Sequence, residues 1–518
     1  MKNNFNKTLD NKIAYQQNLP WVLFTLALFI VISISVLVQK RILSDGSCYA
    51  SIAWNMAHGI GSLWRPIYTP TVLAPVFYEH PTLGMFVDSF FFRAFGSSFI
   101  VERIYCFTML LLTWCAMGLV WFRLQPSANR YILWLLVFCW VIVPEMSHAY
   151  GGNAIELLLV VFTTFSVWII ICALQSDRLN ILRLLLASIC MSGAFFTNGF
   201  QAFFPLAAPF IYKIVFSRSS WKLIGAQTLL LILFTAAIIG AVFLYHPAYT
   251  FMHHYFFQQV FATFTHARIG NGNYRGFSHL MGIWMLLRNF LISLCIISVV
   301  FKIMAKKTGQ PFFQIVKEKL RNKNVIFLFL IGVSASLPIL ASSRQMNHYF
   351  LQAFPFFILT CIVILTPIAQ QWISHTDTHV LYYKKMLKTG TILVAVTTVI
   401  VIALYGHSPP MLQDVTAISK VVPNDTMISA GSNNVWNNWN LQGYFYRYHQ
   451  IYFSQKTGAP FLLEDKVHAY LPAGYEKVDL SLHKFVLYKK SPRFTDSKIP
   501  PVCCANRPPF SKGVKSSR

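Results

Sequence analysis

WVLFTLALFIVISISVLVQKRILSDG occupies residues 21–46 and decides the fold class. Its first part, residues 21–38, has no charged side chain and is long enough to cross a hydrocarbon core of ~30 Å as a helix. Lys40 and Arg41 end the run, and Asp45 follows. Apolar runs of this kind recur along the chain, and only helices or closed barrels satisfy their backbone groups in lipid. Because the runs are continuous rather than alternating, a barrel is excluded and a polytopic helical membrane protein is predicted.

The composition agrees with this class. Of 518 residues, 55% are hydrophobic and 12% are charged, a balance outside the range of soluble proteins. The net charge is +26, but most of the excess lies in short loops between apolar runs, where it faces anionic lipid and sets the topology. We therefore predict no nucleic-acid partner. Most of the ten cysteines lie inside apolar runs and are interpreted as small core residues.

Eleven spanning helices are predicted, with boundaries uncertain by a few residues. They cover residues 21–39, 100–122, 131–147, 154–174, 181–197, 201–216, 223–245, 280–301, 324–342, 350–370 and 390–405. Lys and Arg concentrate in alternate connections, which places the N-terminus in the cytoplasm. An odd number of spans then places the C-terminus outside, so the predicted location is a bacterial inner membrane with an extracytoplasmic, periplasmic C-terminal domain.

Three outer segments are longer than simple connections require. The first outer loop, 40–99, holds two amphipathic stretches, 45–58 and 80–95, that we expect to lie along the membrane interface. The second outer loop is 246–279. Residues 1–405 thus form a predicted transmembrane module, 406–490 a small soluble α/β domain with turn-rich sequence, and 491–518 a disordered tail.

On this topology, scarce carboxylates gather at the outer face. They are Asp45, Glu79, Asp88, Glu102, Glu145 and Glu156. Asp45 precedes an amphipathic stretch, so an N-cap is the alternative to a functional role. Glu79 and His80 stand before Pro81 and add groups for acid–base work or for a divalent cation, or else cap the next helix.

Two of these carboxylates have a basic neighbour. Asp88 with Arg93 and Glu102 with Arg103 suggest structural ion pairs, although Arg103 could also face a phosphate. Glu156 and Asn153, at the outer end of a predicted span, are expected to line a chamber. Glu145 has no explanation from the sequence.

Several motifs occur in a specific order. Residues 45–56 read DGSCYASIAWNM and 77–81 read FYEHP, and Phe95-Gly96 and Glu102-Arg103 follow. This order resembles the first outer loop of the family related to protein O-mannosyltransferases and lipid A aminoarabinose transferases. Further similar elements extend the resemblance over residues 20–450: 197–200 (TNGF), 255–259 (YFFQQ), Arg344 with His348-Tyr349, and 439–448 (WNLQGYFYRY).

The resemblance implies a GT-C fold and a polyprenyl-phosphate sugar donor. The chain departs from the family at Asn198, where relatives carry Lys, at His80, where many carry Lys, and at Gln258-Gln259, where some carry Glu-His. These departures put the corresponding phosphate and metal contacts in doubt. They also suggest a donor headgroup unlike that of the aminoarabinose enzymes.

The chemistry assigns roles to named residues. The departing phosphate needs cations or hydrogen-bond donors, and the candidates are Arg344, His348 and Tyr349, with Arg103, Arg268 and Arg65 behind them. An acceptor hydroxyl needs a carboxylate base, for which Asp45 is the candidate and Glu79 its support. The remaining chamber residues are His80, Tyr49, Asn153, Glu156 and Asn198.

The sequence predicts a direct inverting displacement at the anomeric carbon, without a covalent intermediate. Metal dependence stays open: His253, His254 and His266 with Glu79 would suit a divalent cation, but interfacial hydrogen bonding is the favoured interpretation of the histidines. The acceptor is a lipopolysaccharide group, a protein or a glycan. The alternatives are a transferase of the O-antigen-ligase type and, from another class, a transporter or lipid flippase, which would show interrupted helices and mid-membrane charges.

Overall fold

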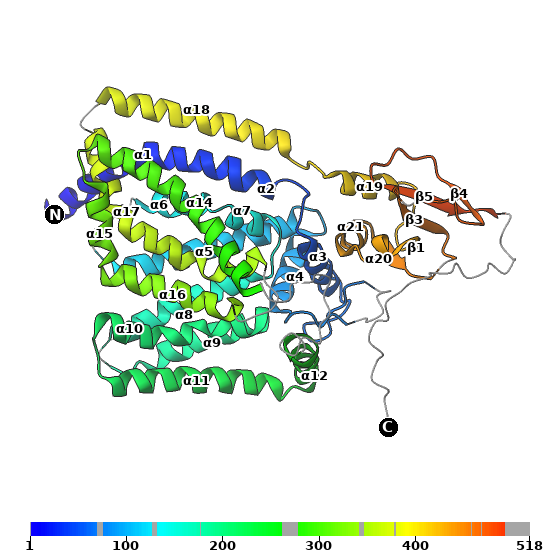
Figure 1. Ribbon diagram of the computed structural model, residues 1–518, viewed down its shortest axis with the longest axis horizontal. Coiled ribbons are helices and arrows are strands. Elements are labelled where there is room, and N and C mark those ends of the chain that lie inside the picture. Colours follow the sequence, from blue (N-terminus) through cyan, green and yellow to red (C-terminus); the bar gives the residue numbers. More distant parts are fainter. Residues whose placement is uncertain are drawn as a thin grey trace. The chain divides into compact units, whose positions relative to one another are not determined.

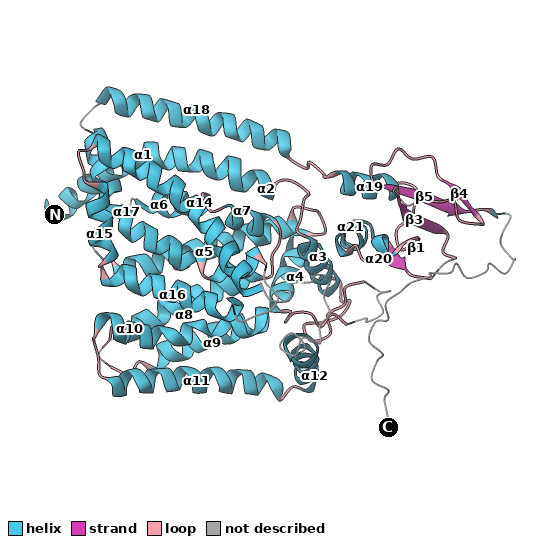
Figure 2. Ribbon diagram, in the orientation of Figure 1, coloured by secondary structure: helices cyan, strands magenta, loops and turns pink. Residues whose placement is uncertain are grey.

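The computed structural model describes residues 2–69, 76–126, 132–176, 178–261, 278–340, 346–377, 380–456, 458–467 and 469–492. The chain divides into two compact units, a helical unit that ends at Ser408 and a second unit that begins at Pro409 (Figures 1 and 2). Each unit is described by itself. The predicted tail from 491 lies almost entirely outside the described residues.

The helical unit is built from long helices joined by short connections (Figure 1). The long helices are α1 (Lys2–Phe29, continued by the π-turn η1, Ile30–Ile34, and by α2, Ser35–Leu37), α5 (Val101–Leu124), α8 (Glu156–Leu174), α9 (Ile181–Asn198), α11 (Trp221–Phe243), α14 (Ser278–Lys307), α16 (Lys323–Leu340), α17 (Phe354–Asp377) and α18 (Val380–Leu404).

Shorter elements fill the connections. They are α3 (Ser44–Ala57), α4 (Leu83–Phe95), α6 (Leu133–Val141), α7 (Pro144–Gly151), the 3₁₀-helix η3 (Gly199–Ala207), α10 (Ala208–Phe216), α12 (His246–Tyr255), the π-turn η4 (Phe256–Phe261), α15 (Phe312–Leu320) and the 3₁₀-helix η5 (Asn347–Gln352).

Eight helical segments in the described part of the chain are long and apolar enough to cross a membrane, or nine if α6 and α7 count as one broken span. The eleven predicted spans all fall on helices, with three differences. The predicted span 280–301 lies within α14, which is not among these eight segments of the described chain. The predicted span 131–147 bends by 83° between α6 and α7, because Pro144 cannot continue the helix of α6 and instead begins α7. The predicted spans 181–197 and 201–216 lie in one helical stretch, Ile181–Phe216, interrupted where Gly199 has a φ of 75°.

The core of the helical unit is an apolar cluster around α5, α6, α8 and α17. Within the apolar windows, 78% of the α17 residues and 72% of the α8 residues are buried, against 22% for α11 and 17% for α18. The last two helices are therefore peripheral, and their exposed apolar side chains would face lipid. Trp121, Trp140 and Tyr150 are among the largest fully buried side chains, so wide aromatic residues fill the centre of the unit.

The second unit is a small mixed α/β domain (Figure 2). Its elements are α19 (Pro410–Ile418), β1 (Met427–Ala430), α20 (Asn433–Trp436), α21 (Trp439–His449), β2 (Tyr452–Ser454), β3 (Phe461–Asp465), β4 (Tyr475–Lys477) and β5 (Phe485–Lys490). The strand order is β2-β1-β3-β5-β4. Strand β1 is parallel to both β2 and β3, and the β3–β5 and β5–β4 pairs are antiparallel.

Candidate functional site

The first turn of α3 carries Asp45. The helix begins at Ser44 because the backbone of Leu43 is extended, so Leu43 occupies the N-cap position and no side chain caps the helix. Asp45 therefore does not serve as the N-cap, which was the alternative to a functional role. Its side chain is exposed and makes no hydrogen bond or ion pair within the described part of the chain. The carboxylate is thus free to meet a ligand.

Three glycines bring the start of α3 against the turn between α7 and α8. The backbone N–H of Leu43 donates to the carbonyl of Gly152 at 3.2 Å, and a Cβ on Gly46 would overlap that carbonyl. A Cβ on Gly151 would overlap Val36. Two backbone segments far apart in sequence therefore touch directly, which only glycine permits at these positions.

Asn153 strengthens this junction. Its φ is 58°, a left-handed conformation that asparagine tolerates better than most residues. Its Nδ2 donates to the carbonyl of Gly46 at 3.3 Å, and the thiol of Cys106 lies 3.6 Å from its Oδ1. The predicted chamber residue Asn153 is thus attached to the residue that follows Asp45.

Arg103 also joins the segment before α3 to the end of α7. Its side chain is 2% exposed, and its guanidinium donates to the carbonyls of Gln39 at 3.1 Å, of Arg41 at 2.7 Å and of Gly151. These bonds tie the end of the first span to α7. Because its Nη1 and Nη2 groups are directed to backbone carbonyls, our functional proposal does not use Arg103 as a phosphate ligand.

Electrostatic interactions show which groups surround α3. Burial raises the pKa of Tyr49 well above its ordinary value, and the charges of Asp45 and Glu156 raise it further, with smaller contributions from Tyr349 and Cys48. Residues of α3, α8 and η5 therefore act electrostatically on Tyr49. The ring of Tyr49 also lies edge-on to His80, with 6.0 Å between ring centroids.

Glu79 belongs to the same neighbourhood. Burial raises the pKa of the Cys48 thiol well above its ordinary value, and the charges of Glu79 and Asp45 add to this. The segment that carries Glu79 and His80 thus lies against the first two turns of α3. The neighbouring Tyr78 contacts the rings of Phe251 and His254 in α12, with 5.5 and 4.8 Å between ring centroids.

Glu156 and Asn198 meet although 42 positions separate them. Glu156 begins α8 and is 1% exposed, and Nδ2 of Asn198 at the end of α9 donates to its Oε1 at 3.3 Å. The other carboxylate oxygen, Oε2, is buried and has no hydrogen-bond partner in the described part of the chain. The turn after Asn198 is held in place because Gly199 leaves room for the Tyr255 hydroxyl.

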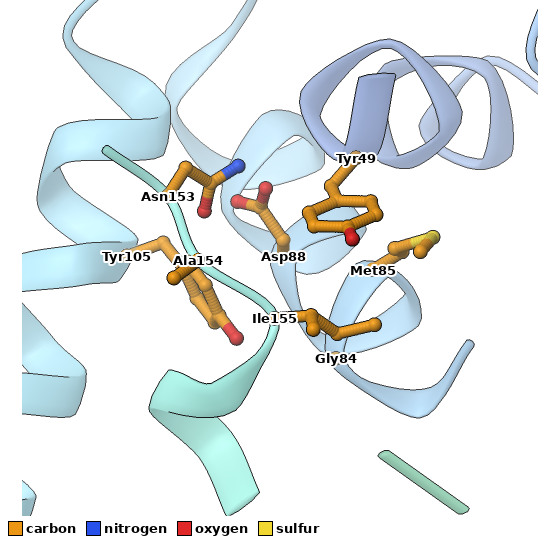
Figure 3. Close-up of a pocket in the computed structure, with 8 residues that line it drawn as sticks. All are labelled: Tyr49, Gly84, Met85, Asp88, Tyr105, Asn153, Ala154 and Ile155. Atoms are coloured by element: carbon orange, nitrogen blue, oxygen red, sulfur yellow. The ribbon is translucent and has the colours of Figure 1, made fainter. Parts of the chain in front are cut away.

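A small cavity lies beside Tyr49 (Figure 3). Its lining comes from α3, α4, α5 and the turn before α8, and consists of Tyr49, Gly84, Met85, Asp88, Tyr105, Asn153, Ala154 and Ile155. Figure 3 shows the carboxylate of Asp88 near the side-chain amide of Asn153. Polar groups from four segments therefore converge next to the helix of Asp45.

Asp88 is a residue whose position the sequence reasoning missed. Arg93, suggested as the ion-pair partner of Asp88, donates to the carbonyl of Met56 at 3.1 Å and lies over the ring of Phe90. Asp88 shares the buried face of α4 with Met85 and Phe92, three and four positions away. That helical spacing was a signal that Asp88 faces inward. The Nη1 and Nη2 groups of Arg103, suggested as the partner of Glu102, donate to backbone carbonyls.

The remaining predicted residues divide into two groups. His348 and Tyr349 lie together in η5, half-buried, with 4.8 Å between ring centroids. Arg344 and Arg268 lie outside the described residues, as does His266. Within the described ranges, no group of three or more His, Cys, Asp or Glu side chains is arranged to hold a metal ion.

Comparisons with known proteins place the fold. No family model matches the sequence, and no curated protein matches it. Among solved structures, ArnT from Cupriavidus metallidurans in the apo state has a TM-score of 0.59 at 12% identity, covering 90% of this chain and 97% of that one. The same protein bound to undecaprenyl phosphate has a TM-score of 0.59 at 13% identity, covering 92% and 99%.

A weaker likeness is found to the oligosaccharyltransferase of Archaeoglobus fulgidus in the apo form. Its TM-score is 0.48 at 11% identity, covering 86% of this chain and 69% of that one, which is too low to carry an argument. At these identities the match to ArnT establishes the fold. The predicted fold class is thereby confirmed: the chain is a multi-pass membrane protein with an all-helical membrane module and a small C-terminal mixed β-sheet domain.

Proposed function

We propose that this chain is a membrane glycosyltransferase that transfers a sugar from a polyprenyl-phosphate donor to an acceptor at the outer face of a bacterial inner membrane. The observation that carries the proposal is the setting of Asp45. An exposed carboxylate stands at the first turn of α3, and Glu79, Glu156 and Tyr349 act electrostatically on Cys48 or Tyr49 of that helix. The shared fold with ArnT, which has been solved with undecaprenyl phosphate bound, supports the donor class.

In the proposed reaction, the acceptor hydroxyl oxygen attacks the anomeric carbon as the bond from that carbon to the donor phosphate oxygen breaks. Asp45 takes the hydroxyl proton as general base, and polyprenyl phosphate leaves with the bonding electron pair. Glu79 acts electrostatically on Cys48, which lies on the same helix as Asp45, and we assign Glu79 the role of supporting that base. A direct displacement of this kind inverts the configuration of the sugar.

The leaving phosphate needs neutralisation where its charge develops. We assign this to Arg344, His348 and Tyr349, with Arg268 as a further candidate. Of these, Tyr349 has structural support, because it interacts electrostatically with Tyr49 one turn after Asp45. We assign the walls of the sugar chamber to Tyr49, His80, Asn153, Glu156 and Asn198. Tyr49 contacts His80, Asn198 contacts Glu156, and Asn153 bonds to Gly46 beside Asp45. The N-terminus would be cytoplasmic and the second unit periplasmic.

The decisive substitution is Asp45→Asn, which removes the base and keeps the side-chain shape. Purified protein would be incubated with radiolabelled polyprenyl-phosphate sugar and cell-envelope acceptors. We expect the transfer rate to fall by about 10²- to 10⁴-fold. The matched control is Asp425→Asn, an exposed aspartate in a turn of the second unit, which should retain the wild-type rate. Full activity of the Asp45→Asn protein would remove the proposed base.

The same assay separates an enzyme from a transporter or lipid flippase. If wild-type protein removes no sugar from the lipid with any envelope acceptor, the glycosyltransferase proposal fails. Movement of intact lipid-linked sugar across proteoliposome membranes, without cleavage, would then support the alternative.

A further inference from the structure

The topology of the second unit marks one edge of its sheet. Strand β1 lies between β2 and β3 and is parallel to both. The connection that leaves the carboxyl end of β1 leads to β2 on one side of the sheet. The connection that leaves the carboxyl end of β3 leads to β4 on the other side, so the two connections diverge between β1 and β3. In open α/β sheets, ligands bind at the carboxyl edge where the strand order reverses in this way.

An unusual segment leaves the sheet at this edge. Residues 431–440 read GSNNVWNNWN and hold five asparagines and two tryptophans; we call them the amide segment. No charged residue occurs from 426 to 446, in a chain with 43 Lys and Arg and 17 Asp and Glu. A phosphate or carboxylate ligand would need basic partners, and residues 426–446 supply none. Side-chain amides both donate and accept hydrogen bonds, as the hydroxyl groups of a neutral sugar require.

Helix capping accounts for only part of this composition. Oγ of Ser432 accepts from the N–H of Val435, and Oδ1 of Asn438 accepts from the N–H of Leu441 at 3.0 Å, so these two residues cap α20 and α21. The other asparagine side chains of the segment do not cap a helix. Within the described residues, no side-chain hydrogen bond is found for the exposed side chains of Asn433, Asn434 and Asn437.

Asn440 offers an independent sign of a missing partner. Its Oδ1 is buried and has no hydrogen-bond partner in the part of the chain that the structure describes. A buried acceptor without a donor costs free energy, so such atoms usually meet a ligand or an ordered water. Asn440 lies one position after Trp439, in the first turn of α21.

The two tryptophans supply the apolar part of a sugar site. Trp439 is 39% exposed and Trp436 is partly exposed. An indole face suits the C–H face of a pyranose ring, because it is apolar and rigid while its edge stays polar. Nε2 of Gln442 donates to the carbonyl of Trp436, which ties α20, the helix of Trp436, to α21, the helix of Trp439.

Close packing fixes the entrance to the amide segment. The N–H of Gly431 donates to the carbonyl of Leu463 at 2.8 Å, and a Cβ on Gly431 would overlap the buried carboxylate of Glu464. The first residue of the segment is therefore held against β3. The exposed amides that follow project from a rigid support, which lowers the entropy cost of binding.

We propose that the amide segment is a binding site for a neutral oligosaccharide, with the tryptophans stacking on sugar rings and the free amides bonding their hydroxyl groups. That this oligosaccharide is the acceptor of the transfer reaction rests on the proposed function. The binding itself does not, so the two can fail separately.

The test uses full-length protein in detergent and saturation-transfer-difference NMR. The probes are a panel of neutral trisaccharides of hexoses and N-acetylhexosamines, with trigalacturonic acid as the anionic comparison. We expect at least one neutral trisaccharide to bind and the anionic one not to bind. The double variant N433A/N434A and the single variant W439A should each weaken binding about tenfold or more.

Matched controls come from the same unit. Asn424, an exposed asparagine, and Tyr470, an exposed aromatic residue, lie outside the segment, so N424A and Y470A should bind as the wild type does. D45N should also bind normally, because binding does not need catalysis. The proposal is overturned if no neutral trisaccharide of the panel binds, if trigalacturonic acid binds equally well, or if the segment variants bind unchanged. Sugar transfer by a protein that binds none of these probes would sink this inference alone.

Discussion

Replacement of Gly46 by alanine should disable transfer more than it destabilises the fold. The added Cβ would overlap the carbonyl oxygen of Gly152, and would lie 3.1 Å from the carbonyl carbon of Gly152 and 3.2 Å from the carbonyl oxygen of Asn153. All three are backbone atoms of a turn that Arg103 holds through Gly151. They cannot rotate away as a side chain would. The first turn of α3 must therefore retreat by about 1.5 Å to restore ordinary contact distances.

That displacement sets the expected magnitude. Overpacking of this kind costs about 1–3 kcal/mol of stability. Asp45 is the adjacent residue and moves with the turn, and a misplacement of about 1 Å lowers a catalytic rate roughly 10²-fold. We therefore expect kcat/KM of the Gly46→Ala protein to fall by about 100-fold, equivalent to about 2.7 kcal/mol of transition-state stabilisation. The thermal midpoint in detergent should fall only modestly.

The assay is transfer of radiolabelled sugar at several donor concentrations, with the thermal midpoint measured on the same preparations. Gly225→Ala and Gly240→Ala are the matched controls, since both glycines lie in α11 and a Cβ on either would meet nothing within 4 Å. Both controls should keep full activity, with stability unchanged or slightly higher because alanine favours helix. Wild-type activity and stability in the Gly46→Ala protein would show that this junction does not position Asp45.

Three further outcomes follow from the structure. Arg103→Met removes the donors of three carbonyls and should lower stability by about 2–4 kcal/mol in detergent unfolding. Arg93→Met removes one part-buried bond and should change stability by less than about 1 kcal/mol, and equal effects of the two substitutions would contradict the structural role of Arg103. Asp414 accepts from the N–H groups of His483 and Lys484, both at 2.7 Å, so Asp414→Ala should destabilise the second unit by about 1–3 kcal/mol, seen as faster proteolysis after residue 408. Burial raises the pKa of the Cys48 thiol, so the unfolded chain loses this proton at a lower pH than the folded chain does, and stability falls as pH rises above about 8.5. Cys48→Ala should therefore reduce the fall in thermal midpoint above that pH. Identical pH profiles of the two proteins would refute this.

The position of the helices could be predicted well, because apolar runs in lipid leave the backbone no alternative to helix. The bend between α6 and α7 was missed although Pro144 marks it, since the run remains apolar up to that residue. The side of α4 that carries Asp88 was also readable from its spacing to buried apolar neighbours. The ion-pair interpretation rested on the closeness of Asp88 and Arg93 in sequence, but the two residues lie on different faces of α4.

The candidate site was predictable only as a set of residues. The carboxylates of the first outer loop and the motif order singled out Asp45 and Glu79, and their placement around α3 is compatible with that choice. The contact between Asn198 and Glu156 could not be predicted, because it joins the ends of two helices whose mutual rotation depends on packing. The same holds for Arg103, which the sequence offers equally well as a phosphate ligand or as a structural residue.

The sequence by itself determined the class of this protein, because long uncharged runs require membrane helices. The orientation of these helices and the gathering of the carboxylates at one face stay predictions from the charged loops. Only the tertiary structure decided what each polar group meets. Three glycines allow two distant backbone segments to touch, and Arg103 locks that contact, which leaves Asp45 exposed while Asp88 and Glu156 are buried. The reason is physical. Periodicity specifies which face of a helix is apolar, whereas the partner of a polar side chain depends on approaches of a few ångströms between elements distant in the chain.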